Sequence, residues 1–358
     1  MSPSASFRPG ALTRSCAAWA PALLVVAGLS ACGSAGKGST AVSVTAPVAA
    51  PGGTAGAARS RRRVASAPPR AASVRLQVRS VGRLPAPVQL PAVAVRGSAL
   101  LAMGGLNAAD GSVADIVRVG AGGSARVVGR LPEALHDAAA ATVDCRTIFI
   151  GGGNAGAGKS AVLRVAPDGT TSQEPSLPAG ASDVEAATIG STAYVVGGYT
   201  GTVPLRSIFA LRPGRRVRVV GEMPRPLRYA AVAAVDGKLL IAGGTSGTAA
   251  RREILRFDPV TGRVRHVGDL PAVTTHAAGA ALNGRFYVLG GRGDGLSAQR
   301  RTVTAVDAAT GHTSPGGRLP VALSDLSAGS LADRVVVVGG RDAAGRVHDE
   351  IWTLLSAR

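Results

Sequence analysis

Short apolar runs separated by turn-forming residues recur along residues 73–358 of the chain. In one stretch they cover residues 229–235, 238–242, 253–257 and 264–267. No window keeps a 3.6-residue apolar period over the length of a helix, so the pattern predicts strands. Asp236-Gly237 joins the first two runs of this stretch and suits a two-residue hairpin, because a type I′ turn needs positive φ at both positions.

Two landmarks repeat six times and divide these strands into units. An apolar residue followed by proline occurs at Leu84, Leu131, Leu177, Met223, Leu270 and Leu319. A Gly-Gly pair begins 20 residues after each of them, at Gly104, Gly151, Gly197, Gly243, Gly290 and Gly339. The step between units is 46 to 49 residues, which indicates a repeat architecture with one four-stranded unit per repeat.

The two ends of the repeated region complement each other. Residues 73–81 precede the first unit as a lone strand, and residues 350–355 form a third strand with no fourth strand after it. We expect the two to pair and close a ring without exposed sheet edges. The first strands of the units, such as residues 138–143, 230–235 and 277–282, are rich in alanine, as expected where sheets taper together at an axis.

Four-stranded units at this step, each with Gly-Gly after a hydrophobic strand, resemble Kelch-repeat β-propellers. Phe257-Asp258-Pro259 occupies the slot of the family's aromatic-Asp-Pro sequence, whereas Val217 and Val264 stand where the family usually has a tryptophan. The resemblance covers about residues 73–358. It implies an all-β fold, a six-bladed Kelch-type β-propeller whose last blade is closed by the strand at about residues 73–81.

The N-terminal region carries the pattern of an export signal. Arg8 and Arg14 precede a short apolar stretch at residues 20–29, too short to span a bilayer. Leu29-Ser30-Ala31-Cys32 resembles the bacterial lipoprotein box, which implies a signal peptide at residues 1–31 and a lipid on Cys32. The alternative is an ordinary secretory signal with a chance cysteine. Residues 32–72, rich in Gly, Pro, Ala and Arg, are expected to form a disordered tether before the propeller at residues 73–358.

The formal net charge of +19 raises the question of nucleic-acid binding. Eight of the 40 basic residues and none of the 21 acidic ones precede residue 73, and the remaining arginines are scattered through all six repeats. An exported chain without a concentrated basic stripe is not expected to bind nucleic acid. The charge instead suits an anionic cell envelope, and we expect anchoring by lipid to the outer face of the bacterial cell membrane.

Polar residues recur where each unit enters its first strand. In a four-stranded meander, this segment and the loop after Gly-Gly emerge at the same edge, so six copies of each should surround the mouth of a central channel. Glu185 is the only charged residue at its place in the repeat. The candidate ligand-binding residues at these positions are His136, Asp137, Ser182, Asp183, Glu185, Arg228, Tyr229, Thr275, His276, Ser324 and Asp325. The alternative is that these positions are polar only because strand starts at a channel mouth are hydrated.

The carboxylates and histidines of this set could supply acid–base groups or bind a cation, but no segment has the ligand spacing of a metal site. No cofactor and no metal are expected. The sequence Gly153-Asn154-Ala155-Gly156-Ala157-Gly158-Lys159-Ser160 matches the phosphate-binding P-loop pattern. That chemistry needs a helix after the Lys-Ser, whereas the repeat predicts a strand at residues 161–165, so no nucleotide is expected.

The sequence therefore favours an envelope-anchored propeller that acts as a binding or scaffold module through its channel-mouth face. Its partner would be an envelope protein, a glycan or a small polar ligand. The alternative is a carbohydrate-active enzyme, because some secreted bacterial six-bladed Kelch proteins are sialic-acid epimerases. Asp183, Glu185, Arg228 and His276 would then be the acid–base candidates. Fold alone does not decide between the two.

Overall fold

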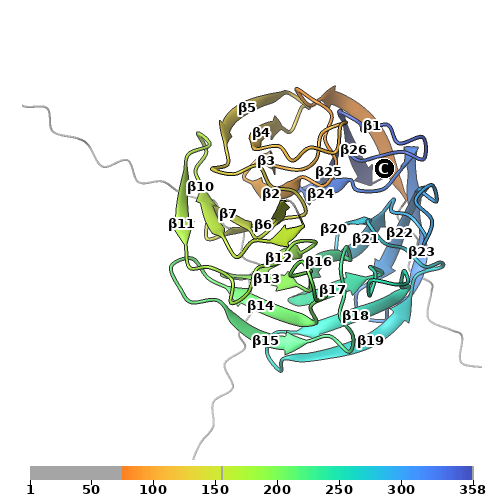
Figure 1. Ribbon diagram of the computed structural model, residues 1–358. Helices are drawn as coiled ribbons and strands as arrows, with labels where there is room; N and C mark the ends of the chain where they lie inside the picture. Colours follow the sequence, from red (N-terminus) through yellow and green to blue (C-terminus); the bar gives the residue numbers. More distant parts are fainter. Residues whose placement is uncertain (1–74, 155, 357–358) are drawn as a thin grey trace, which may run out of the picture. The chain divides into compact units, whose positions relative to one another are not determined.

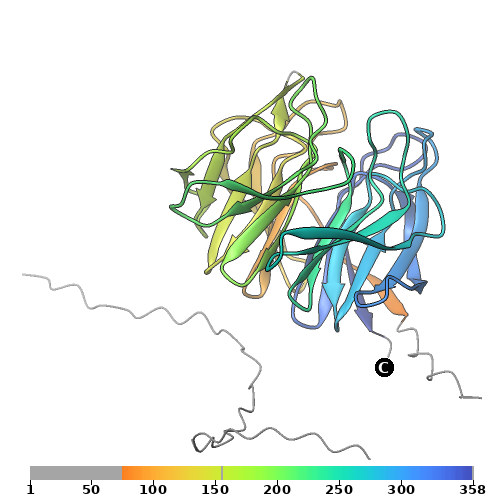
Figure 2. The ribbon, with the colours of Figure 1, turned by 90° about the horizontal axis from the view of Figure 1, so that it is seen from below.

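The computed structural model describes residues 75–154 and 156–356, which form six four-stranded antiparallel sheets around a central axis (Figures 1 and 2). The prediction of a six-bladed all-β propeller is confirmed. The predicted signal peptide (residues 1–31), Cys32 and the tether (residues 32–72) lie outside the described residues. In the described part of the chain there is no helix of the length and hydrophobicity that crossing a membrane requires.

Each blade runs from an inner strand near the axis to an outer strand, and the blades are numbered here in chain order. Blade 1 comprises β2 (Ala92–Arg96), β3 (Ala99–Met103), β4 (Asp115–Gly120) and β5 (Ala125–Arg130). Blade 2 comprises β6 (Ala139–Val143), β7 (Arg146–Ile150), β10 (Val162–Val165) and β11 (Thr171–Glu174). Blade 3 comprises β12 (Glu185–Ile189), β13 (Thr192–Val196), β14 (Ser207–Leu211) and β15 (Arg218–Glu222).

Blades 4 and 5 follow the same order, and blade 6 combines both ends of the propeller. Blade 4 comprises β16 (Ala231–Val235), β17 (Lys238–Ala242), β18 (Glu253–Asp258) and β19 (Arg263–Asp269). Blade 5 comprises β20 (Ala278–Leu282), β21 (Arg285–Leu289), β22 (Arg300–Asp307) and β23 (Thr313–Leu323). Blade 6 comprises β24 (Ser327–Ser330), β25 (Arg334–Val338), β26 (Glu350–Ser356) and β1 (Leu76–Arg83).

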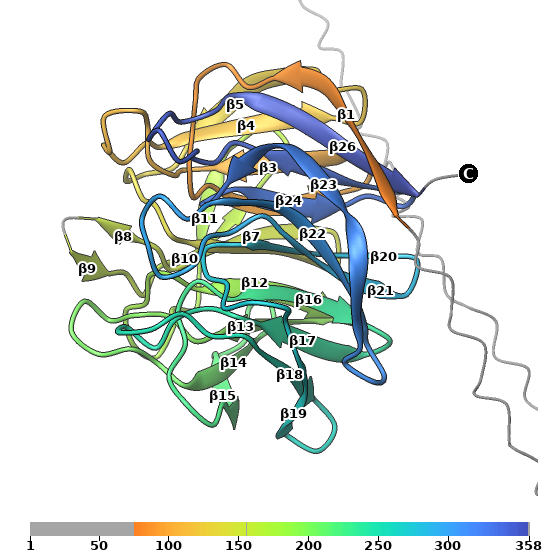
Figure 3. The same cartoon turned by 90° about the vertical axis from the view of Figure 1, so that its right-hand side faces the viewer.

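The first and last strands close the ring as predicted. β1 pairs antiparallel with β26 from Leu76 opposite Ser356 to Arg83 opposite Glu350, and the two lie side by side in Figure 3. The Arg83 guanidinium also pairs with the Asp349 carboxylate, with Nη1 2.7 Å from Oδ1. Blade 6 therefore ties the start of the propeller to its end.

The hydrophobic core is divided among the six blade interfaces. Buried apolar side chains form six clusters, each built from two neighbouring blades. Near the axis the inner strands contact one another directly, and a Cβ added to Gly279 would lie 2.4 Å from the backbone nitrogen of Val232. This crowding explains why the inner strands consist of alanine, glycine and other small residues.

The Gly-Gly pairs join each blade to the next. In all six repeats the N–H of the second glycine donates a hydrogen bond of 2.8–2.9 Å to a carbonyl at the entry of the following blade. Gly244, for example, donates to Thr274, and a Cβ on the neighbouring Gly243 (φ 66°) would lie 2.2 Å from that same oxygen. A side chain on the first glycine would collide with the carbonyl oxygen that accepts from the second glycine. This steric limit accounts for the sixfold repetition of the pair.

Candidate functional site at the channel mouth

Six equivalent residues form a backbone ring at the channel mouth. Each has a φ between 52° and 60°, in the left-handed region that residues other than glycine rarely adopt. The six are Leu90, Asp137, Asp183, Tyr229, His276 and Asp325. Their shared conformation shows that the repeat fixes the backbone at this position while leaving the side chain free to differ.

Hydrogen bonds between neighbouring blades hold this ring. Five of the six residues donate their N–H to the carbonyl of the equivalent residue one blade earlier, at 2.7–3.3 Å. Asp183, for example, donates to Asp137, and Leu90 at the entry of the first blade donates to Asp325 at the entry of the last, each at 2.7 Å. These bonds offset the cost of about 1–2 kcal/mol that a left-handed backbone imposes on each residue.

The residues that precede the ring pair with the loops that follow Gly-Gly, as the meander predicts. Single antiparallel bridges join Gln89 to Leu106, His136 to Gly153, Ser182 to Tyr199, Arg228 to Thr245, Thr275 to Arg292 and Ser324 to Arg341. The structure therefore brings the sequence-predicted candidates together around one opening. Ser182, Asp183, Thr275, Ser324 and Asp325 are 0–9% exposed, so hydration does not account for the polar side chains at these five positions.

Arg228 and Asp183 form the central ion pair of the mouth. The Nε of Arg228 donates to Oδ2 of Asp183, whose side chain is 2% exposed. The guanidinium carbon of Arg228 lies 4.1 Å from the ring centroid of Tyr199 and 5.2 Å from that of Tyr229. The arginine is thus held by one carboxylate and two aromatic faces.

A stacked pair connects this arginine to the far side of the mouth. The rings of Tyr229 and His276 stack with centroids 3.8 Å apart, and the Tyr229 hydroxyl donates to Oδ2 of Asp137 at 3.2 Å. Burial, and then the cations Arg292 and Arg228, lower the pKa of His276 well below its ordinary value. The ring is therefore neutral near pH 7, and its contact with Asp325 at 3.8 Å is not an ion pair there. This neutral ring can accept at Nε2 from Arg292 (3.4 Å) and donate from Nδ1 to Thr275 (3.0 Å).

Burial raises the pKa of two carboxyl groups around the channel, those of Asp137 and Asp325. Burial, and then the charges of Asp183 and Asp325, raise the pKa of Asp137 well above its usual range, and its Oδ1 is buried without a hydrogen-bond partner. Burial also raises the pKa of Asp325, although Ser324 donates to its carboxylate. His136, which contacts Ser112 at 2.8 Å, has its pKa lowered by burial. The mouth thus holds several titratable groups whose pKa values are shifted by burial.

Glu185 lies one step deeper, inside the channel. It borders both a cavity of about 30 Å³ beneath the ring and a cavity of about 50 Å³ between the inner strands. Burial raises the pKa of Glu185 to about 8. Protein surrounds the Glu185 side chain, but its accessible surface faces the channel. Water in the channel therefore limits the rise in the pKa of Glu185. Cavities of this size hold one or a few water molecules and no sugar ring.

A larger groove lies beside the ring, over blades 5, 6 and 1. Its volume is about 390 Å³, and its walls include Gln89, Asp110, Arg292, Gln299, Asp325 and Arg341. Arg341 pairs with Asp110 across the groove at 3.0 Å. Of the eleven candidate ligand-binding residues, Asp325 alone lines this groove, whereas Asp137, Asp183, Glu185, Tyr229 and His276 line the narrow cavity next to it.

Asp110 and Gln299 were missed by the sequence reasoning. Both lie in loops after Gly-Gly, and Gln299 bridges to Arg292 within its own loop. Their polar side chains were visible, but the repeat does not specify how these loops fold back over the mouth. A sixfold alignment could have suggested only that these loops are near the opening.

Two other sequence features are placed by the structure. The P-loop-like stretch forms the small hairpin of β8 (Gly153–Asn154) and β9 (Ala157–Gly158), and β10 follows as the predicted strand. Within residues 75–154 and 156–356, no three His, Cys, Asp or Glu side chains are grouped so that they could hold a metal ion.

The architecture and the repeat define the class of protein as a six-bladed Kelch-type β-propeller. A family model described as the Kelch motif matches residues 226–271, which contain blade 4. No curated protein matches the chain. Among solved structures, that of YjhT is similar, with a TM-score of 0.67 and 14% sequence identity over 77% of this chain and 97% of that one. At this identity the likeness concerns the fold.

Proposed function

We propose that the propeller is a binding module that holds a small polar ligand, of the size and polarity of a sugar, in the groove at the channel mouth. The groove of about 390 Å³ lined by charged and amide side chains is the observation that carries this proposal. Arg292, Arg341, Gln89 and Gln299 offer donors, and Asp110 and Asp325 offer acceptors, which suits a ligand with many hydroxyl groups.

The place of action proposed for this module is the outer face of the bacterial cell membrane, with the lipid on Cys32 as its anchor. The proposal rests on the lipoprotein-box resemblance at Leu29-Ser30-Ala31-Cys32. Mass spectrometry of the mature protein tests it: the expected first residue is a lipidated Cys32. A mature chain that retains unlipidated residues before Cys32 would exclude the anchor.

A glycan and metabolite binding screen on the full chain tests the ligand class. For a ligand that binds, Arg341→Ala is expected to raise the dissociation constant at least tenfold, because the groove loses a charged donor. Arg216→Ala removes an exposed arginine of blade 3 and is the matched control. Equal loss in both variants, or no binding across the screen, would contradict a ligand site at the mouth.

Sugar epimerisation is a second candidate, favoured by the acid–base groups beside the groove. Glu185, with a pKa of about 8, can exchange a proton near pH 7, and the neutral His276 lines the same cavity. The space argues against them as catalysts for a bound sugar, because the cavity they line is only about 30 Å³. NMR can follow the interconversion of the ring forms of a sialic acid and so test for epimerase activity. Catalysis by the unaltered protein that is lost in Glu185→Gln would favour the enzyme.

A further inference from the structure

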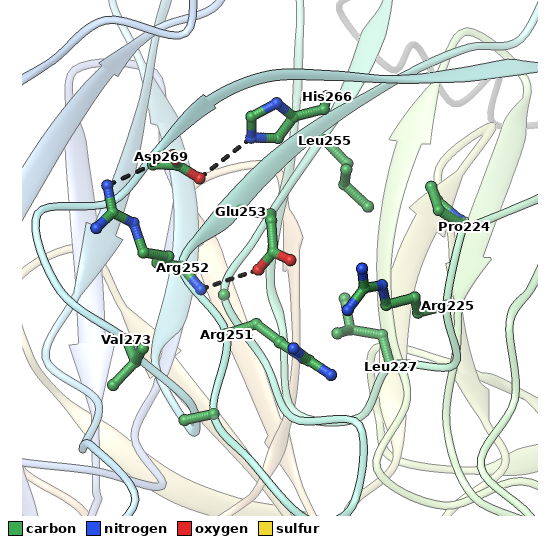
Figure 4. A pocket seen from close by; sticks show the side chains of 12 residues that line it. Pro224, Arg225, Leu227, Arg251, Arg252, Glu253, Leu255, His266, Asp269 and Val273 are labelled. Atoms are coloured by element: carbon green, nitrogen blue, oxygen red, sulfur yellow. Dashed lines mark hydrogen bonds and ion pairs between the residues drawn. The ribbon is translucent and has the colours of Figure 1, made fainter.

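A second pocket lies away from the channel mouth, on blade 4. Its volume is about 550 Å³, within the range of sites that take small organic ligands. Leu227, Leu255 and Val273 give it apolar walls, and Arg225, Arg251 and Glu253 give it charge. Figure 4 shows the guanidinium groups of Arg225 and Arg251 directed from two sides toward the space between Glu253 and Leu227. We refer to it as the blade 4 pocket.

The two arginines of this pocket have no anionic partner among the described residues. Neither Arg225 nor Arg251 takes part in an ion pair, and Nε of Arg251 is buried without a hydrogen-bond partner. Arg251 uses only Nη2, which donates to Ser246 at 2.9 Å. Arg225 is exposed, whereas the buried Nε of Arg251 lacks an acceptor, which an anion in the pocket would supply.

The same two positions in blade 2 form an ordinary ion pair. Glu133 follows the Leu131-Pro132 pair as Arg225 follows Met223-Pro224. Lys159 and Arg251 each donate their backbone N–H at 2.8 Å to the second glycine of their own repeat, Gly152 and Gly244. In blade 2 the pair closes, with Nζ of Lys159 2.6 Å from Oε1 of Glu133. Blade 4 has replaced the acid by a second cation.

The acids of the blade 4 pocket are already engaged elsewhere. Asp269 contacts Arg252 at 3.4 Å and His266 at 3.1 Å, and Glu253 accepts the backbone N–H of Arg252 at 3.2 Å. Arg225 and Arg251 together with Glu253 leave one positive charge unbalanced. A monoanion therefore fits this balance better than a dianion does.

We propose that the blade 4 pocket binds a small organic carboxylate with an apolar body. The carboxylate lies between Arg225 and Arg251, where Glu133 lies beside Lys159 in blade 2, and supplies the acceptor that Nε of Arg251 lacks. The apolar body rests on Leu227, Leu255 and Val273. This site is separate from the groove at the channel mouth and does not depend on it.

Titration of the full chain with octanoate by isothermal calorimetry tests the proposal, with octanamide as the uncharged probe of equal length. Octanoate is expected to bind at one site, and octanamide at least tenfold more weakly. Arg225→Glu should raise the dissociation constant for octanoate at least tenfold, because the new carboxylate pairs with Arg251. Arg251→Ala should do the same, and a thermal melt confirms that each variant is folded.

The control is Arg216→Glu, which makes the same change of charge at an exposed position of blade 3. It should leave octanoate affinity within twofold of the unaltered protein. Binding that survives both Arg225→Glu and Arg251→Ala, or the absence of saturable octanoate binding, would overturn the assignment. Loss of binding in Arg341→Ala alone would place the carboxylate at the channel mouth and would overturn it equally.

Discussion

The channel mouth and the blade 4 pocket both gather arginines next to apolar or aromatic side chains, but they treat the charges in opposite ways. At the mouth, Arg228 is paired with the buried Asp183 and covered by two tyrosine rings. In the blade 4 pocket, Arg225, three residues earlier in the same segment, has no ion-pair partner among the described residues. The Arg228–Asp183 pair is satisfied internally, whereas Arg225 and Arg251 are left for a ligand.

The difference between the two regions indicates where functional residues lie in a repeat protein. The backbone ring and the Gly-Gly hydrogen bonds recur in every blade, because they hold the blades together. Arg225 and Arg251 stand where blade 2 has an ion pair, so the two blades differ at positions that the repeat does not fix. Departures of this kind mark candidate sites more sharply than the presence of charge does.

The largest effect is expected at Gly243, which borders the blade 4 pocket but belongs to the repeated framework. Gly243→Ala places a Cβ 2.2 Å from the Thr274 carbonyl at a positive φ, so we expect a loss of about 3–5 kcal/mol in the free energy of unfolding. Gly237→Ala, also at positive φ but in open space, should cost about 1 kcal/mol. Urea denaturation compares them, and equal losses would refute the role of the interblade contact.

The next largest effect is expected where the mouth loses its cation. Arg228→Ala leaves the buried Asp183 carboxylate without its partner, and we expect a loss of about 3 kcal/mol in the free energy of unfolding. Arg225→Ala should change this quantity by less than about 0.5 kcal/mol, because no ion pair is lost. If the two variants melt at the same temperature, the distinction between the paired mouth and the unpaired pocket is lost.

A pH series should reveal the carboxyl inside the channel. The pKa of Glu185 is raised to about 8 in the folded protein, so between about pH 5 and 8 the unfolded chain releases a proton that the folded one keeps. The contribution of Glu185 to the free energy of unfolding is therefore fully present at low pH. It is lost as the pH rises from about 5 through about 8. Glu185→Gln should flatten that decline in urea denaturation. Glu222→Gln, an exposed carboxyl of blade 3, is the control, and parallel curves for all three proteins would contradict the shift.

The smallest effect is expected from exchanging charge between blades 4 and 2. Arg225→Glu should stabilise the protein by about 0.2–1 kcal/mol, because it recreates beside Arg251 the pairing of Glu133 with Lys159. Glu133→Arg should reverse this in blade 2 and lower the melting temperature slightly. Shifts of the same sign in both variants would show that the two positions are not equivalent.

The fold could be predicted from the sequence because the same physical demands recur six times. The Gly-Gly pairs, the apolar-Pro pairs and the small inner strands each answer a steric or hydrogen-bonding need of the blade interface. The turn at Asp236-Gly237 also has the positive φ at both positions that the sequence predicts. Even the pairing of β1 with β26 followed from counting strands.

The sites could be predicted only in part. The repeat located the candidate residues at one opening, but it gave no sign that Asp183 pairs with Arg228 or that His276 stacks on Tyr229. The blade 4 pocket escaped notice because it depends on how two long side chains are oriented and on a missing acid. Such features arise from differences between repeats, and periodicity averages those differences away.

The pairing of β1 with β26 has a consequence for how the chain folds during synthesis. Arg83 and its partner Asp349 are separated by 266 positions along the chain. During synthesis β1 emerges first and remains without its neighbour until the last segment is made, and bringing such distant segments together is entropically slow. Removal of the last seven described residues, β26, would strand β1 and leave both ends of the ring open to strand exchange with another copy.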